Sequence, residues 1–152
     1  MITKNSYEKV GNFFGRWWES SLQVPYDVII LVDDSDTDKT RDFVKKFAQV
    51  NGKEVIIERS RLYGWRKPTR AAARQTAIDI FFQNTTAKRL LFLDDDVMLK
   101  EGWWNEAREY VEEERVGLIW GVEIAEFWHE RLAHIRVRGV DPISYSIQNL
   151  IR

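Results

Sequence analysis

The sequence predicts an α/β fold in which helices cover a mostly parallel sheet. Strand-like and helix-like segments alternate along the 152 residues, which is typical of a parallel sheet covered on both faces. The strand-like segments are continuously apolar, as at 28–32 and 90–93, whereas a half-exposed strand would alternate apolar and polar residues. Both observations indicate strands buried on both faces.

The first half of the chain carries two expected helices and two expected strands. A helix over 6–22 follows from aromatic and aliphatic residues at helical spacing, and a strand over 27–32 comes after Pro25. A second helix over 40–50 leads through Asn51-Gly52 into a strand over 53–58.

Beyond a loop marked by Gly64 and Pro68, the alternation continues. An alanine-rich helix comes first, then an apolar strand, an amphipathic helix and another strand. The expected ranges are 69–82, 89–93, 102–114 and 116–122. The last thirty residues are less periodic, and the two helices expected there cover 127–137 and 143–151.

Length and composition are typical of one globular domain spanning 1–152. The hydrophobic fraction of 44% and the net charge of −1 give no global electrostatic reason to expect a nucleic acid partner. The absence of cysteine excludes disulfides and thiolate metal sites, which suits a cytoplasmic location. No apolar stretch approaches the roughly 20 residues that a membrane-spanning helix needs.

Two acidic clusters directly follow two of the apolar runs. Since ligands of open α/β sheets collect outside the carboxyl ends of the strands, these carboxylates predict a site. So much negative charge on one rim repels itself unless a cation or a hydrogen-bonding ligand is present. The carboxylates are Asp33, Asp34, Asp36, Asp38, Asp94, Asp95 and Asp96.

The triple aspartate favours a divalent cation. Strand side chains alternate, so Asp94 and Asp96 would lie on the same side and share a cation completed by water and phosphate oxygens. Capping of the following helix is the alternative here, as it is for Asp36 and Asp38. The spacing from Asp34 onward also imitates a calcium loop, but that loop is excluded because Lys39 stands where glycine is required.

A basic segment separates the two clusters. From 59 to 78 there are six bases and no acid, and several of them fall at the start of the 69–82 helix, where the macrodipole disfavours positive charge. An anion bound at that helix terminus would explain this arrangement, and pairing with the aspartates is the alternative. The bases are Arg59, Arg61, Arg66, Lys67, Arg70 and Arg74. Carboxylates, a cation and a basic helix start together predict a diphosphate clamp.

At these residues the chain resembles the nucleotide-binding half of a family 2 glycosyltransferase with the Rossmann-like GT-A fold. The segment 32–40, Val-Asp-Asp-Ser-Asp-Thr-Asp-Lys-Thr, resembles the family's Val-Asp-Asp-Gly-Ser-Thr-Asp-Gly-Thr. Ala73-Arg74-Gln75 resembles its Ala-Arg-Asn, and 93–96 resembles the DXD motif, followed by Trp103. The match keeps order and spacing over 1–122, and 123–152 remains a tail expected to be helical.

The resemblance implies an inverting glycosyltransferase that moves a sugar from a nucleotide-diphospho-sugar to an acceptor hydroxyl. Asp34 would meet the nucleotide base, Asp33 would support its loop, and Asp94, with Asp95 in the same site, would lie near the ribose. Asp96, with Asp94, would hold Mn²⁺ or Mg²⁺ against the diphosphate. The bases implied for the leaving group are Arg66, Lys67, Arg70 and Arg74. The resemblance assigns no catalytic base and does not say whether the acceptor is a glycan, a lipid or a protein.

The chain departs from the family pattern at both ends. It begins almost inside a segment that a full strand should precede, at Ile2-Thr3-Lys4-Asn5, and nothing after Gly121 resembles the acceptor half. We therefore expect a gap between 27–32 and 89–93, direct pairing of the two, or a strand from another chain, and we expect self-association into a homo-oligomer. A nucleotide-sugar-binding remnant without turnover is the alternative function. A haloacid-dehalogenase-like phosphatase, with Asp94 as nucleophile, is less favoured.

Overall fold

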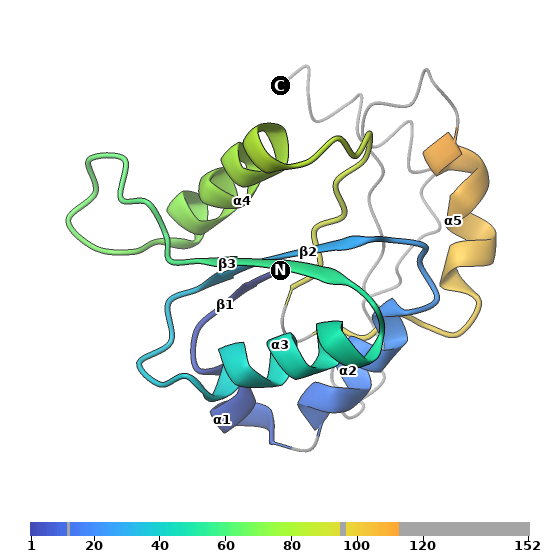
Figure 1. The fold of residues 1–152 in the computed structure, drawn as a ribbon, viewed down its shortest axis with the longest axis horizontal. Coiled ribbons are helices and arrows are strands. Elements are labelled where there is room, and N and C mark those ends of the chain that lie inside the picture. Colours follow the sequence, from blue (N-terminus) through green and yellow to red (C-terminus); the bar gives the residue numbers. More distant parts are fainter. Residues whose placement is uncertain (12, 95–96, 113–152) are drawn as a thin grey trace, which may run out of the picture. The chain divides into compact units, whose positions relative to one another are not determined.

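The computed structural model describes residues 1–11, 13–94 and 97–112, and the chain divides after Trp103 into two units. The first unit carries seven elements in the order strand, two helices, strand, helix, strand, helix (Figure 1). They are β1 (Ile2–Thr3), α1 (Ser6–Val10), α2 (Phe13–Ser21), β2 (Val28–Asp33), α3 (Lys39–Val50), β3 (Glu54–Glu58) and α4 (Arg70–Asn84). The helix α5 (Trp103–Glu112) begins at the boundary and is described by itself.

The sheet of the described residues is fully parallel, with β2 in its centre and the order β1-β2-β3. Along β2 and β3 the register pairs Val28 with Glu54 and Val32 with Glu58. β1 pairs through two residues only, Ile2 with Val32 and Thr3 with Asp33. The expected α/β fold with a parallel sheet is confirmed.

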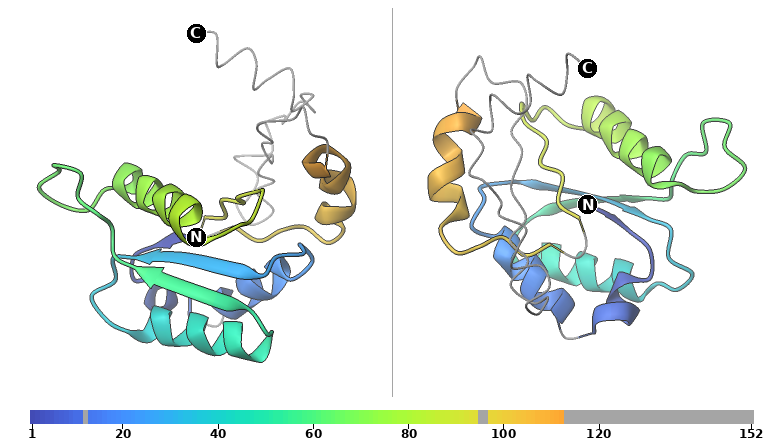
Figure 2. Two further views of the ribbon diagram at one scale, coloured as in Figure 1. Left: turned by 45° about the horizontal axis from the view of Figure 1, so that its top comes forward. Right: turned by 180° about the vertical axis from the view of Figure 1, so that it is seen from behind.

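Helices cover both faces of this sheet (Figure 2). On one face α4 packs Ala73, Ala77 and Ile80 against Ile30 and Val32. The opposite face is covered by α2 and α3, whose buried residues Phe14, Trp18, Val44 and Ala48 pack against Ile29 and Leu31. Neighbouring residues of β2 therefore enter two different cores, which explains why the strand is continuously apolar.

The expected helix over 6–22 forms as two helices. α1 ends at Val10 because Gly11 adopts a φ of 52°, a left-handed conformation that glycine tolerates, and its N–H bonds to the carbonyl of Tyr7. Of the residues at helical spacing, Phe14 and Trp18 are 0% and 3% exposed on α2, whereas Tyr7 and Leu22 are 37% and 39% exposed. The spacing thus identified the buried face, and the glycine divides the helix.

The expected strand over 89–93 does not form. No residue from 85 to 94 belongs to a strand, and Leu91 and Phe92 are 43% and 41% exposed. A strand forms only beside a neighbour that offers a row of backbone groups, and β1 with its two residues offers almost none. Segment 89–93 does not pair with β2, so the expected direct pairing of the two segments is not found in the described structure.

The other expected elements of the described chain are confirmed within two residues at each end. Within α5, Ala107 is buried. The strand expected over 116–122 and the helices expected over 127–137 and 143–151 lie outside the described residues. Among the helices that the structure describes, none is long and apolar enough to cross a membrane.

Candidate functional site

The carboxyl end of β2 places a fully buried carboxylate beneath an exposed acidic loop. Asp33 is 0% exposed, and its Oδ1 accepts hydrogen bonds from the backbone N–H and the hydroxyl of Ser35, the N–H at 3.1 Å. This local bond, from an aspartate to the residue two positions on, turns the chain sharply after the strand. The family resemblance implied that Asp33 supports this loop, and the structure shows its carboxylate buried and bonded to Ser35 within the loop.

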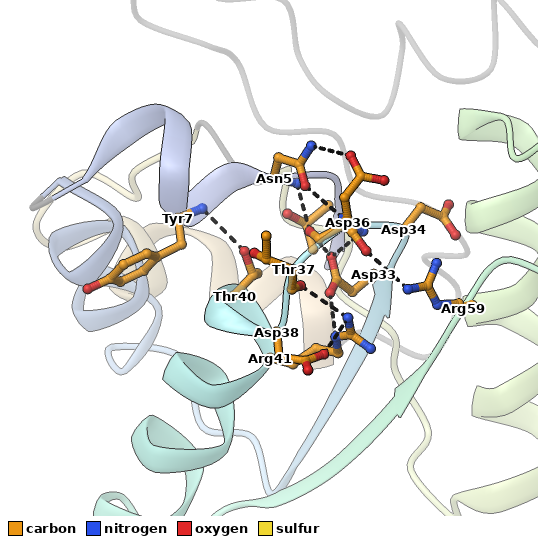
Figure 3. A network of polar contacts seen from close by, with 12 residues as sticks. Asn5, Tyr7, Asp33, Asp34, Asp36, Thr37, Asp38, Thr40, Arg41 and Arg59 are labelled. Atoms are coloured by element: carbon orange, nitrogen blue, oxygen red, sulfur yellow. Dashed lines mark hydrogen bonds and ion pairs between the residues drawn. The ribbon is translucent and has the colours of Figure 1, made fainter.

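Arg41 binds this loop from the first turn of α3 (Figure 3). Its guanidinium approaches Asp33 Oδ2 at 3.1 Å and Asp38 Oδ1 at 2.6 Å, and it donates to the carbonyl of Thr37 at 3.1 Å. The Nε–H is not aimed at Asp33 Oδ2, so that contact is an ion pair without a hydrogen bond. Asp38 stands at the N-cap of α3 but makes no capping bond with its side chain, since its carboxylate pairs with Arg41.

The outer side of the loop is fixed by residues that follow β1. The side-chain amide of Asn5 accepts from the Asp36 N–H at 2.9 Å and donates to Asp36 Oδ2 at 3.1 Å. The backbone N–H of Asn5, a residue with a φ of 57°, donates to Ser35 Oγ at 2.7 Å. The loop is therefore held from β1 as well as from α3.

A further bond joins the loop to α1. The hydroxyl of Thr37 donates to the carboxylate of Glu8, and this hydrogen bond lowers the pKa of Glu8 from 4.5. One turn further, the hydroxyl of Thr40 accepts from the N–H of Tyr7 at 3.3 Å (Figure 3). These two contacts hold the start of α3 against α1.

Asp34 lies across the end of β3. Its two carboxylate oxygens accept from the backbone N–H of Ser60 at 3.1 Å and from the Ser60 hydroxyl at 2.5 Å. Arg59, the residue before, donates to the carbonyl of Ser35 at 3.2 Å. The ends of β2 and β3 thus form one polar rim, with Asp34 partly exposed upon it.

The basic segment leads from this rim to the start of α4. Thr69 caps the helix by accepting from the Ala72 N–H at 3.0 Å, and no acid stands in the first turn. Arg66, Lys67 and Arg70 are exposed and form no ion pair with any residue from 1–11, 13–94 or 97–112. Exposed cations beside a helix N-terminus form a suitable place for an anion.

Two bases of the sequence cluster have other partners. Arg61 pairs with Glu58 at 3.2 Å and with Asp79 at 3.7 Å. Arg74, one turn into α4, places Nη2 3.4 Å from each carboxylate oxygen of Asp94, and both side chains are about half-exposed. Among the described residues, Arg74 is thus the only base of the segment 59–78 that forms an ion pair with an aspartate of the two acidic clusters.

The expected metal site is only partly within the described structure. Asp94 is described, whereas Asp95 and Asp96 lie outside the described residues. Among the residues that are described, no three metal-ligating side chains gather. Asp94 is an oxygen donor of the type that Mg²⁺ and Mn²⁺ prefer, and its long, half-exposed contact with Arg74 leaves the carboxylate accessible, so the donor chemistry fits such an ion.

The structure brings the sequence-predicted residues together in two groups, the loop at 33–38 and the pair Arg74–Asp94. Three residues that position the loop at 33–38 were not predicted from the sequence, namely Asn5, Arg41 and Ser60. The spacing of Asp38 and Arg41, three residues apart at a helix start, was a usable signal for Arg41. No local pattern identifies Asn5 or Ser60, because their partners lie 31 and 26 residues away in the chain.

A comparison with family models matches residues 1–148 to the model described as glycosyl transferase family 2. No curated protein and no solved structure gives a significant match. The matched range covers nearly the whole chain and includes the loop after β2, the start of α4 and the aspartates at 94–96. The chain therefore belongs to glycosyl transferase family 2.

Proposed function

We propose that this chain binds a nucleotide-diphospho-sugar at the rim formed by the ends of β2 and β3 and the start of α4. The observation that carries the proposal is the start of α4, where Arg66, Lys67 and Arg70 lie exposed without ion pairs among the described residues. A diphosphate offers the charge that these cations and the helix N-terminus lack. Family membership supports a sugar nucleotide as the source of that diphosphate.

We assign the base and the ribose of the nucleotide-diphospho-sugar to different residues of the site. Asp34 is partly exposed, and we assign it to the nucleotide base, with the ribose nearer Asp94 and Asp95. Asp33 is a positioning residue, because its carboxylate is fully buried and engaged by Ser35 and Arg41. Arg41 and Asn5 hold the same loop from opposite sides, so the Asp34 carboxylate is placed before any ligand binds.

A divalent ion fits the second group of site residues, the one that contains Asp94. Asp94 and Asp96 would hold Mn²⁺ or Mg²⁺, which would supply positive charge to the departing diphosphate. Arg74 lies beside Asp94 and keeps a cation at this carboxylate when no metal is bound. With a divalent ion at Asp94, the Arg74 guanidinium would be available to the diphosphate, since both side chains are about half-exposed.

The reaction we propose is sugar transfer with inversion. An acceptor hydroxyl forms a bond to the anomeric carbon, the bond from that carbon to the diphosphate oxygen breaks, and the hydroxyl proton passes to a carboxylate. That carboxylate is not assigned among the described residues. A binding protein without turnover is the second candidate, and release of nucleoside diphosphate on adding a glycan, lipid or protein acceptor distinguishes the two.

The donor site is tested by thermal unfolding with a nucleoside diphosphate. The ligand should raise the melting temperature more with Mn²⁺ than with EDTA, since it stabilises only the native state. Asp94→Asn and Asp96→Asn should each remove that difference, whereas Asp27→Asn, at an exposed aspartate outside the rim, should leave it unchanged. A metal-dependent rise in melting temperature that survives both the Asp94 and the Asp96 substitution would remove these aspartates from the site.

The basic clamp needs a separate test. Arg70→Ala should weaken binding of the nucleoside diphosphate by roughly tenfold, because a charge-assisted hydrogen bond is lost, and should hardly change binding of the free nucleoside. Arg108→Ala, at an exposed arginine on α5, is the matched control. Equal loss for both ligands would show that Arg70 acts structurally and would overturn the clamp.

A further inference from the structure

The loop between β3 and α4 extends beyond the end of the sheet (Figures 1 and 2). Within this loop lies a tight turn, in which the N–H of Trp65 donates to the carbonyl of Leu62 at 2.7 Å. The two central residues, Tyr63 and Gly64, have φ values of 46° and 86°, and positive φ at both is characteristic of a type I′ turn. A hydrogen-bonded turn therefore shapes this projection.

Three apolar side chains are exposed on this turn. Leu62, Tyr63 and Trp65 are 43%, 46% and 56% exposed. The turn is also anchored to α4, since the Tyr63 hydroxyl donates to Asp79 Oδ2 at 2.5 Å and Arg61 pairs with the same carboxylate. We call Leu62–Trp65 the apolar tip. These half-exposed side chains belong to neither of the two core clusters.

Cations flank the apolar tip. Arg66 and Lys67 follow Trp65 directly, and neither forms an ion pair with the described residues. The nearby acids Glu58 and Asp79 are occupied by Arg61. The surroundings of the tip are therefore positively charged, although the whole chain has a net charge of −1.

We propose that the apolar tip docks on the surface of an anionic lipid bilayer. Tryptophan and tyrosine are the side chains that favour the boundary between headgroups and acyl chains, and leucine favours the acyl chains. Arginine and lysine beside them attract anionic headgroups and strengthen binding roughly fivefold each near such a surface. A projecting turn is convex, which suits insertion between lipids, whereas an extended glycan or a nucleic acid strand is bound in a groove.

This docking would place the α4 start, and thus the proposed donor site, close to the membrane surface. Arg66 and Lys67 take part in both proposals, whereas Leu62 and Trp65 have no part in the proposed clamp, so variants of these two apolar residues separate lipid docking from donor binding. Lipid binding and nucleoside diphosphate binding are measured separately on the same variants, so that failure of one leaves the other standing.

The test is co-sedimentation with vesicles of phosphatidylcholine, with or without an equal part of phosphatidylglycerol. The wild-type chain should partition onto the anionic vesicles only, and salt should weaken this binding because it screens surface charge. Trp65→Ala should lower partitioning roughly tenfold and Leu62→Ala roughly fivefold, since each removes apolar surface from the bilayer. Phe82→Ala is the matched control, because Phe82 is 77% exposed near the far end of α4, and it should have no effect.

Fluorescence adds a direct readout of insertion. Vesicles with brominated acyl chains should quench the wild-type emission, and Trp65→Phe should remove most of that quenching while keeping partitioning nearly intact. Unchanged partitioning of Trp65→Ala, or equal binding to both kinds of vesicle, would overturn the proposal. So would binding of a single-stranded oligonucleotide that Trp65→Ala abolishes, which would assign the apolar tip to nucleic acid instead.

Discussion

Two segments of this chain have nearly the same sequence pattern and reach opposite structures. Ile29-Ile30-Leu31-Val32 ends in Asp33-Asp34, and Leu90-Leu91-Phe92-Leu93 ends in Asp94-Asp95. In the first, Leu31 and Val32 are 0% exposed at the centre of the sheet and Asp33 is buried behind them. In the second, Leu91 and Phe92 are about two-fifths exposed, and Asp94 meets only a half-exposed arginine among the described residues.

An apolar run followed by aspartates therefore forms a strand only where neighbouring strands exist. β2 has β3 along five residues on one side and β1 along two on the other, with helices on both faces. The run at 90–93 has no such strand beside it in the described structure. Backbone groups that no neighbour pairs with must face water, so the segment keeps part of its apolar surface exposed.

The largest expected contrast concerns the two leucines. Leu31→Ala should lower the free energy of unfolding by about 3 kcal/mol, because it leaves a cavity between β2 and its covering helices. Leu91→Ala should cost below about 1 kcal/mol, since much of that side chain already meets water. Urea unfolding of both variants measures the contrast. Equal losses in the free energy of unfolding would show that 90–93 is as well packed as β2.

The two aspartates provide the second contrast. Asp33→Ala removes a buried carboxylate that accepts from Ser35 and pairs with Arg41, and it should cost about 3 kcal/mol. Asp94→Ala breaks a half-exposed pair and should cost below about 0.5 kcal/mol. Arg41→Met, measured alone and with each aspartate variant, shows how much of the loss at Asp33 comes from its ion pair with Arg41. A small effect of Asp33→Ala would mean that the loop does not need its buried carboxylate.

Self-association is the third expectation. If the exposed run at 90–93 mediates it, replacing Leu91 and Phe92 by serine should weaken association roughly tenfold, because less apolar surface is then buried between copies. Sedimentation at several concentrations checks this, with Val50→Ser as the control at another exposed apolar residue. A monomer at every concentration would show that the exposed run does not associate.

The smallest expected effect is a pH dependence of the contact between α1 and the loop that follows β2. The bond from Thr37 lowers the pKa of Glu8 below 4.5, so Glu8 stabilises the fold above that pH and loses this contribution as pH falls through its folded value. Glu8→Gln should therefore melt slightly earlier than the wild type near neutral pH, and the difference should vanish in acid. Equal melting temperatures of the two proteins near neutral pH would show that the bond from Thr37 to Glu8 does not stabilise the fold.

Hydrophobic periodicity and turn residues in the sequence were sufficient to predict most helices and strands of the described fold. They predicted α3, β3, α4 and α5 closely, because each has a clear apolar face or a turn at its end. They also located the acidic loop and the basic start of α4. They did not predict the break at Gly11, where one residue of positive φ interrupts an otherwise continuous helical pattern.

The sequence by itself determined the α/β fold class, the buried central strand and the presence of carboxylates and bases in a fixed order, because these follow from local spacing. The tertiary structure decided which apolar run becomes a strand and which aspartate is buried. It also decided which distant residues, Asn5, Arg41 and Ser60, hold the site in place. The physical reason is that strand pairing and burial depend on neighbours from other parts of the chain, and local spacing carries no record of those neighbours.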